Sequence, residues 1–141
     1  MAEMTLDLAR QMCDAAVARA KDQGIRVSVV VLDAGGHIVA VVRMDGCNYL
    51  SPDIARGKAY AAAAWKQASA DLRERWQDSA AVVAGMVGIS GGRIVPVQGA
   101  LPIFDGQCCL GAIGASGARS DEDEDAVRAG VEAVGLATKP A

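Results

Sequence analysis

The chain has 141 residues, a formal net charge of −3, and a composition that is 52% hydrophobic but only 4% aromatic. This length predicts a single domain over residues 1–141, with a core of aliphatic side chains and alanines. The mild acidity and the lack of Lys and Arg runs interleaved with aromatic residues argue against a nucleic-acid partner. No apolar stretch reaches the ~18–20 residues that a membrane-spanning helix needs, so we expect no membrane partner.

The N-terminal segment predicts a helix over residues 5–23. Its apolar residues recur at spacings of three and four, while Thr5 suits the N-cap and Gly24 the C-terminal stop. The stretch Met1–Ala20 contains acidic residues in place of the basic patch and apolar block of a signal peptide. We therefore expect a cytoplasmic protein.

Two valine-rich runs follow, Arg26–Leu32 and His37–Met44, and they flank the turn sequence Asp33–Gly36. Runs of β-branched residues around a Gly-containing turn predict a β-hairpin. His37, at the start of the second run, is the chain's single histidine. Its place beside the turn makes this hairpin the first segment to consider for a functional site.

The middle of the chain predicts helices. Ser51 and Pro52 have the residue types preferred at an N-cap and first helical position, and the alanine-rich helix that they begin extends to about Ala68. Shorter helices are expected near Asp71–Trp76 and Ser79–Met86.

Three short strands and a final helix are predicted in the C-terminal part. The strands are expected at Arg93–Val97, Leu101–Phe104 and Cys108–Gly114, and the helix runs from Ser120 to about Leu136. The whole order predicts an α/β fold of the α+β type, in which helices flank a largely antiparallel sheet of about five strands.

Several motifs are better explained by structure than by chemistry. Gly88–Gly92 has the spacing of a nucleophile elbow, but His37 precedes it and a strand follows it, which argues against a serine hydrolase. The acidic run Asp121–Asp125 is interpreted as a helix cap. With one histidine and no C-x-x-C pair, no metal site is expected. The four cysteines, Cys13, Cys47, Cys108 and Cys109, are interpreted as small buried hydrophobic residues.

Four polar residues remain as candidates for a site. His37 is either an exposed turn residue, an axial ligand of haem iron, or a general acid or base near neutral pH. Lys58 is either solvated or a partner for a substrate carboxylate or a haem propionate. Arg43 and Asp45 face the same side of a strand end, where an ion pair between them would hold the following loop.

The sequence resembles the GlcG/HbpS-like family, also called the haem-degrading domain family, over nearly its whole length. The segments that carry the resemblance are Val29–Ala40, Arg43–Gly46, Ile54–Ala55, Lys58–Tyr60, Gly99–Ile103, Asp105–Gly106, Gly111–Gly117, Asp123–Glu124 and Ala129–Gly130. The resemblance implies an antiparallel sheet flanked by helices and assembly as a homo-oligomer, often an octamer. It also implies haem binding or degradation, a relation to domains fused to corrinoid adenosyltransferases, or a place beside glycolate use and other catabolism.

The first hypothesis is a cytoplasmic, oligomeric small-molecule binding protein whose cofactor or ligand is haem or a related tetrapyrrole. His37 would be the iron ligand, and Lys58 or Arg43 would pair with the propionates.

The second hypothesis is a metal-free enzyme without a cofactor, a tautomerase, isomerase or lyase, that acts on a small organic acid in a catabolic or biosynthetic pathway. Lys58 and Arg43 would hold the carboxylate, and His37, Glu124 or Lys58 itself would move a proton. The predicted substrate-binding residues are Arg43, Asp45, Gly99 and Pro102. The third hypothesis is a structural or regulatory oligomer without a site.

Overall fold

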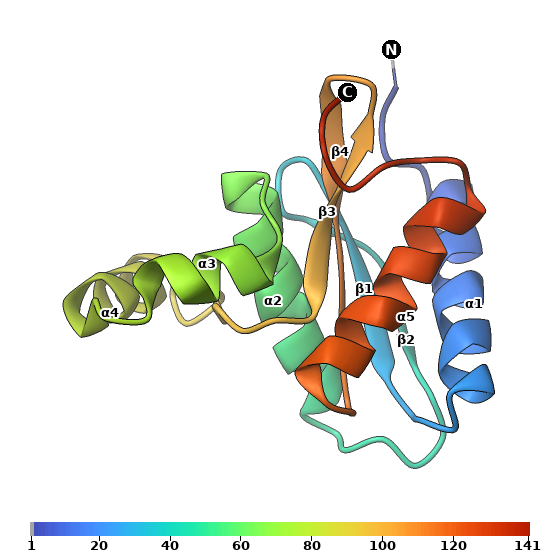
Figure 1. Cartoon of the computed structure of the whole chain (residues 1–141), viewed down its shortest axis with the longest axis horizontal. Helices are drawn as coiled ribbons and strands as arrows, with labels where there is room; N and C mark the ends of the chain where they lie inside the picture. The colour runs from blue at the N-terminus through green and yellow to red at the C-terminus, as the bar shows by residue number, and fades with distance from the viewer. Residues whose placement is uncertain (1) are drawn as a thin grey trace.

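The computed structural model describes residues 2–141, which form five helices and one four-stranded sheet (Figure 1). In chain order the elements are α1 (Leu6–Asp22), β1 (Ser28–Asp33), β2 (Ile38–Arg43), α2 (Ser51–Trp65), α3 (Ser69–Trp76), α4 (Ala80–Ile89), β3 (Ala100–Asp105), β4 (Cys108–Ser116) and α5 (Ser120–Ala133). The strand order is β2-β1-β4-β3, and each neighbouring pair is antiparallel. The predicted α+β class is therefore confirmed.

The sheet lies between two helical layers. Helices α1 and α5 pack side by side on one face and α2 packs on the other, while α3 and α4 extend away from the sheet (Figure 1). Successive residues of β1 alternate between the layers, because side chains of a strand point to opposite faces. Val29 and Val31 join the core under α1 and α5, whereas Val30 and Leu32 join the core under α2.

Small residues bring α2 and α5 unusually close to their neighbours. A Cβ atom on Gly114 of β4 would lie 2.4 Å from the Ala55 carbonyl oxygen of α2, and one on Gly130 of α5 would lie 2.7 Å from the Met12 carbonyl oxygen of α1. Both glycines therefore allow backbone-to-backbone packing that a larger residue would prevent.

The predicted helices, hairpin turn and Thr5 N-cap are present, with shifts of a few residues at the helix and strand ends. Ser51, expected at the N-cap of α2, is instead its first helical residue, and Leu50 occupies the N-cap without a side-chain hydrogen bond. The Thr5 hydroxyl accepts a hydrogen bond from the Leu8 N–H at 3.2 Å, as expected for an N-cap. Helix α2 ends at Trp65 and not at Ala68, because Lys66 adopts a left-handed conformation with φ of 54°.

The expected sheet of about five strands has four, because residues 93–97 do not form a strand. The Val95 N–H donates to the Gly57 carbonyl oxygen of α2, so this segment is tied to a helix. Pro96 has no N–H to offer a strand partner. Valine-rich composition predicted a strand here, but the segment instead packs across α2.

The outer edge of β3 is capped at both ends. At its start, the Ala100 N–H donates to the Ser69 hydroxyl, which also lies within hydrogen-bond distance of the Ala100 carbonyl oxygen. Near its end, Phe104 and Ala137 exchange two backbone hydrogen bonds. Within residues 2–141, no strand pairs with the outer edge of β2.

The motifs that were set aside have structural roles. Ser90, at the end of α4, donates to the Val87 carbonyl oxygen and accepts from the Ile94 N–H, so it caps a helix end. Burial, with Asp14 nearby, raises the pKa of the Cys13 thiol to about 11. The prediction of buried cysteines is correct for Cys13 and Cys47 but wrong for Cys108, which is exposed where β4 leaves its hairpin turn. Cys109 is half-buried.

No helix in the described part of the chain combines the length and apolar character needed to cross a bilayer.

Candidate functional site

The face of β2 on the side of α2 is open, because α2 covers β1, β4 and β3 and makes little contact with β2. Ile38 and Val41 are paired with Leu32 and Val30 of β1 and share their face, yet they are 48% and 44% exposed. Arg43 follows on the same face at the end of the strand. Two exposed apolar side chains and a guanidinium thus lie in a row.

The face of α2 turned toward the hairpin adds two more side chains. A Cβ atom on Gly36 would lie 3.1 Å from the Tyr60 ring, so Tyr60 lies against the hairpin turn. Arg56 lies one helical turn before Tyr60 and so shares its face of the helix. The Arg56 Nε is buried and has no hydrogen-bond partner among the described residues. We call the surface formed by Ile38, Val41, Arg43, Arg56 and Tyr60 the β2 shelf.

His37 lies in the hairpin turn beside the shelf, with its side chain 81% exposed. It is paired with Asp33 and therefore directs its side chain to the opposite face of the hairpin from Ile38. The Asp33 carboxylate accepts hydrogen bonds from the N–H groups of Gly35 and His37 at 2.9 and 3.0 Å, and it lies 3.3 Å from the His37 Nδ1. Burial acts to raise the pKa of Asp33, but these donors and the imidazole outweigh it and hold that pKa below its usual value. With Nδ1 directed to a carboxylate, Nε2 is the ring nitrogen left for a ligand.

Arg43 lies at the end of the shelf away from the hairpin turn. Its Nη1 donates to the Cys47 carbonyl oxygen at 3.0 Å, so the guanidinium holds the loop before α2. Asp45 is exposed in this loop, and no ion pair in the described part of the chain joins it to Arg43. The loop is therefore held through a backbone carbonyl group, and the predicted Arg43–Asp45 pair is absent.

Lys58 lies in the interior. Its Nζ donates to the Ala115 carbonyl oxygen at 3.0 Å and to Asp123 Oδ2 at 3.1 Å, and the Lys58 and Asp123 side chains are 4% and 2% exposed. The other oxygen of Asp123 accepts from the Ala118 N–H at 3.1 Å. Burial raises the pKa of the Asp123 carboxyl, against the opposing effects of the Lys58 ammonium and the Ala118 N–H.

Two predicted substrate-binding residues also lie inside the fold. Gly99 has a φ of +137°, and a Cβ atom there would lie 2.8 Å from the Lys58 Nζ. Pro102 is buried in β3, opposite Ala112 of β4. Both residues therefore shape the packing around β3 and the Lys58–Asp123 pair.

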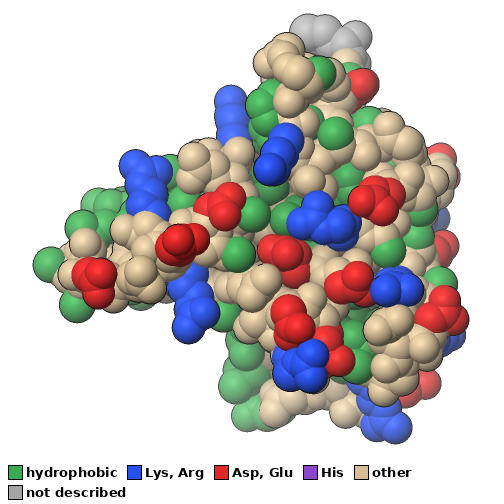
Figure 2. Space-filling view, in the orientation of Figure 1, with side chains coloured by type: hydrophobic (Ala, Val, Ile, Leu, Met, Phe, Trp, Pro, Cys, Tyr) green, Lys and Arg blue, Asp and Glu red, His purple; other side chains and the backbone are tan. Residues whose placement is uncertain are grey.

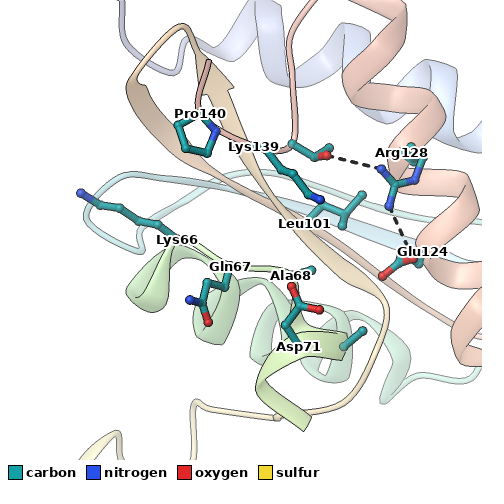
Figure 3. Close-up of a pocket in the computed structure, with 11 residues that line it drawn as sticks. Lys66, Gln67, Ala68, Asp71, Leu101, Glu124, Arg128, Lys139 and Pro140 are labelled. Atoms are coloured by element: carbon teal, nitrogen blue, oxygen red, sulfur yellow. Dashed lines mark hydrogen bonds and ion pairs between the residues drawn. The ribbon is translucent and has the colours of Figure 1, made fainter. Parts of the chain in front are cut away.

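Glu124 lies elsewhere, in a cavity of ≈ 700 Å³ between the α2–α3 junction, β3, α5 and the C-terminal segment (Figure 3). Its carboxylate is 3.6 Å from Arg128 Nη2. The predicted residues thus separate into four places: His37 in the hairpin turn, Arg43 on the β2 shelf, Lys58 in the interior, and Glu124 in this cavity.

Sequence reasoning missed Asp123 and Arg56. Asp123 was part of an acidic run interpreted as a solvated cap, and nothing in its spacing distinguished it from its neighbours. Arg56 could have been found by placing it one turn before Tyr60 on the same helix face.

Comparisons with known proteins agree on one family. The family model described as "Haem degrading protein HbpS-like" matches residues 4–132. The 15.0 kDa protein of the dhaT-dhaS intergenic region of Citrobacter freundii is 32% identical over 123 residues, which are 87% of this chain and 86% of that protein.

Two solved structures have the same fold at higher than 25% identity. A crystal structure described as a PduOC:heme complex has a TM-score of 0.88 and 27% identity, and the match covers 98% of this chain and 99% of that one. A double mutant of Streptomyces reticuli HbpS has a TM-score of 0.81 and 28% identity, with 94% and 87% of the two chains covered.

Proposed function

Because the chain belongs to the HbpS-like family, we propose that it is a small-molecule binding protein whose β1–β2 hairpin, with the β2 shelf, takes haem or a related tetrapyrrole. The observation that carries the proposal is an exposed imidazole in the hairpin turn, oriented by the Asp33 carboxylate, on the hairpin whose other face has the exposed apolar side chains of β2. Histidines that bind metals usually direct their second ring nitrogen to a carboxylate or a carbonyl group in this way. The related structure with bound heme supports the same ligand class.

The residues of the hairpin turn and the shelf fit the parts of a haem. His37, at the hairpin turn, offers Nε2 as an iron ligand, while Ile38, Val41 and Tyr60 on the other face of the hairpin offer apolar and aromatic surface. Arg43 and Arg56 offer guanidinium groups for the propionates. The buried Arg56 Nε has no hydrogen-bond partner among the described residues, so it is free to donate to a ligand carboxylate. When bound, haem iron would supply a coordination site and redox chemistry.

In this proposal Lys58 has a structural role and does not pair with a propionate. Its three-donor ammonium already has a carbonyl group and a carboxylate within about 3 Å, and its side chain is 4% exposed. Breaking such a buried pair to free the lysine would leave the Asp123 charge uncompensated.

We also propose that the protein assembles with copies of itself in the cytoplasm. Helix α4 has no buried residue, and its apolar side chains form much of the projecting tip in Figure 2. Large exposed apolar patches mark interaction surfaces, and homo-oligomers are the usual soluble assemblies. Free cysteines are in keeping with a reducing compartment.

Haemin titration of the purified chain, followed by its Soret band, tests the ligand assignment. We expect saturation at one haemin per chain, a changed Soret maximum in His37→Ala, and about tenfold weaker binding in Asp33→Asn, since carboxylates that orient ligating histidines contribute about 10–100-fold to affinity. The matched control is Arg10→Ala, which removes an exposed charge on α1. A His37→Ala spectrum identical to that of the native chain would remove His37 as the ligand, and a titration without saturation would remove haem.

A further inference from the structure

The cavity beside β3 is built from four segments that are distant in sequence. Its walls are the α2–α3 junction, Leu101 of β3, α5, and the C-terminal segment that returns along β3 (Figure 3). Its volume, ≈ 700 Å³, lies in the range of small-molecule sites. It shares no residue with the β2 shelf, so a ligand here would be independent of the proposed haem site.

Charges of both signs gather around this cavity. In Figure 3, Arg128 and Lys139 lie on one side, and Asp71 and Glu124 direct their carboxylates toward the same space. Two cations therefore face two anions across the cavity, and the third lining cation, Lys66, directs its side chain away from it.

These groups keep much of their bonding capacity. Arg128 donates to the Thr138 hydroxyl at 3.3 Å and lies 3.6 Å from the Glu124 carboxylate, which orients a guanidinium that has five N–H donors. No side-chain hydrogen bond or ion pair between residues 2 and 141 engages Asp71 or Lys139. The cavity thus presents donors and acceptors to an incoming molecule.

The chemistry of the lining selects a ligand class. A carboxylate would meet Arg128 and Lys139, and an ammonium group would meet Asp71 and Glu124. The apolar part of the lining, Ala68, Leu101 and Pro140, would contact a hydrocarbon group between or beside the two charges. A dianion such as phosphate would be opposed by both carboxylates.

We propose that this cavity binds a small zwitterion, an amino acid with an apolar side chain. The charge balance of four ionisable groups, the oriented Arg128 and the apolar wall all favour a molecule that carries one carboxylate, one ammonium and a hydrocarbon group.

Isothermal titration of the full chain with three matched probes tests the proposal. L-Leucine carries both charges, 3-methylbutan-1-amine lacks the carboxylate, and 4-methylpentanoate lacks the ammonium. We expect saturable binding of leucine at one per chain, with each single-charge analogue bound about tenfold more weakly, the effect of losing one charge-assisted hydrogen bond.

Two variants give a charge-selective readout. Lys139→Gln should weaken leucine and 4-methylpentanoate about tenfold and leave 3-methylbutan-1-amine unchanged, whereas Asp71→Asn should weaken leucine and the amine and leave the acid unchanged. The controls Lys21→Gln and Asp22→Asn remove the same charges from exposed positions of α1.

Absence of saturable leucine binding, equal binding of all three probes, or leucine binding that neither variant alters would each overturn the proposal. Haemin titration of Lys139→Gln should match the native chain, so failure at this cavity is distinguishable from failure at the β2 shelf.

Discussion

The Lys58–Asp123 pair is the most enclosed ion pair among the described residues. The two side chains come from the sheet-facing side of α2 and the first turn of α5, and both are almost completely buried. A buried ion pair is a weak source of net stability, since both charges lose their hydration, but loss of one partner is strongly destabilising. The pair therefore makes the position of α5 depend on a residue of α2.

Substitution of Lys58 by Met should remove about 3–5 kcal/mol from the free energy of unfolding near neutral pH, because Asp123 is left buried and charged. The double variant Lys58→Met with Asp123→Leu should recover most of this loss, since no charge remains buried. Denaturant titration of both variants, with the exposed Lys21→Met as the control, measures the effect. A loss in Lys58→Met no larger than in the control would contradict it.

The same substitution should depend on pH. Burial already raises the native pKa of Asp123, and without the Lys58 ammonium that pKa rises further. Between the ordinary pKa of an Asp and this raised pKa, Asp123 is protonated in the native state and ionised in the unfolded chain. Protonation of Asp123 therefore adds stability that is fully present below the ordinary Asp pKa and is lost as pH rises through the raised pKa. The deficit of Lys58→Met should therefore shrink from pH 8 to pH 5, and a deficit independent of pH would count against the burial of Asp123.

The candidate residues were only partly predictable. The positions of His37 and Arg43 could be predicted from the sequence, because the valine-rich run after the Gly-containing turn fixes where the second strand begins and ends. The environment of Lys58 was not, because an alanine-rich helix has small residues on every side and no apolar stripe that marks its buried face. Its partner lies 65 residues away in the chain, and only the tertiary fold brings the two together.

At the scale of elements, helix α5 contacts α1 through a glycine. Gly130 is buried, and its missing side chain leaves room for the Met12 carbonyl oxygen of α1. In an open helix, replacement of glycine by alanine stabilises by about 0.5–1 kcal/mol, because glycine has the greater conformational freedom to lose. Here the added methyl group would force the two helices apart.

We expect Gly130→Ala to destabilise the protein by about 1–3 kcal/mol, the range for overpacking of a close-packed interior. Thermal or chemical unfolding, with far-UV circular dichroism to confirm unchanged helix content, checks the sign as well as the size. A gain in stability would show that α1 and α5 tolerate a wider separation than the structure has.

The elements themselves were largely predictable, and the exceptions have physical causes. The β1–β2 hairpin combines β-branched runs with a glycine turn, so local sequence and tertiary packing agree. Residues 93–97 have the same valine-rich composition, but Gly57 leaves a gap in α2 that the Val95 side chain occupies. Composition cannot distinguish a strand from a segment packed on a helix at this position. The outcome depends on Gly57, which lies almost forty positions earlier in the chain.

At the scale of the whole molecule, α4 is the described helix that has no buried residue. Its helix contacts are mainly with α3, and Ile89 at its end is 85% exposed. Val82 lies two helical turns before Ile89 and shares its face. An apolar face of this kind on a small protein supports the proposed contact with a second copy.

The double variant Val82→Lys with Ile89→Lys should shift the protein to smaller species, because each lysine would place an unpaired charge in an apolar contact whose central residues contribute about 2 kcal/mol or more. Size-exclusion chromatography with light scattering, over a range of concentrations, measures the change. Leu6→Lys on α1 is the control, since it makes the same change at a half-exposed leucine outside α4. A native chain that is already monomeric, or a variant of unchanged mass, would exclude this contact.

The two outer edges of the sheet differ in whether another strand can pair with them. Ser69 and Ala137 occupy the hydrogen-bonding groups at both ends of β3, while β2 presents an outer border without a partner within residues 2–141. A sheet with one free edge can pair with one neighbouring sheet. When the β2 edges of two copies pair, neither copy has a free edge left. The fold thus permits a continuous eight-stranded pair but resists the open-ended stacking that leads to fibres.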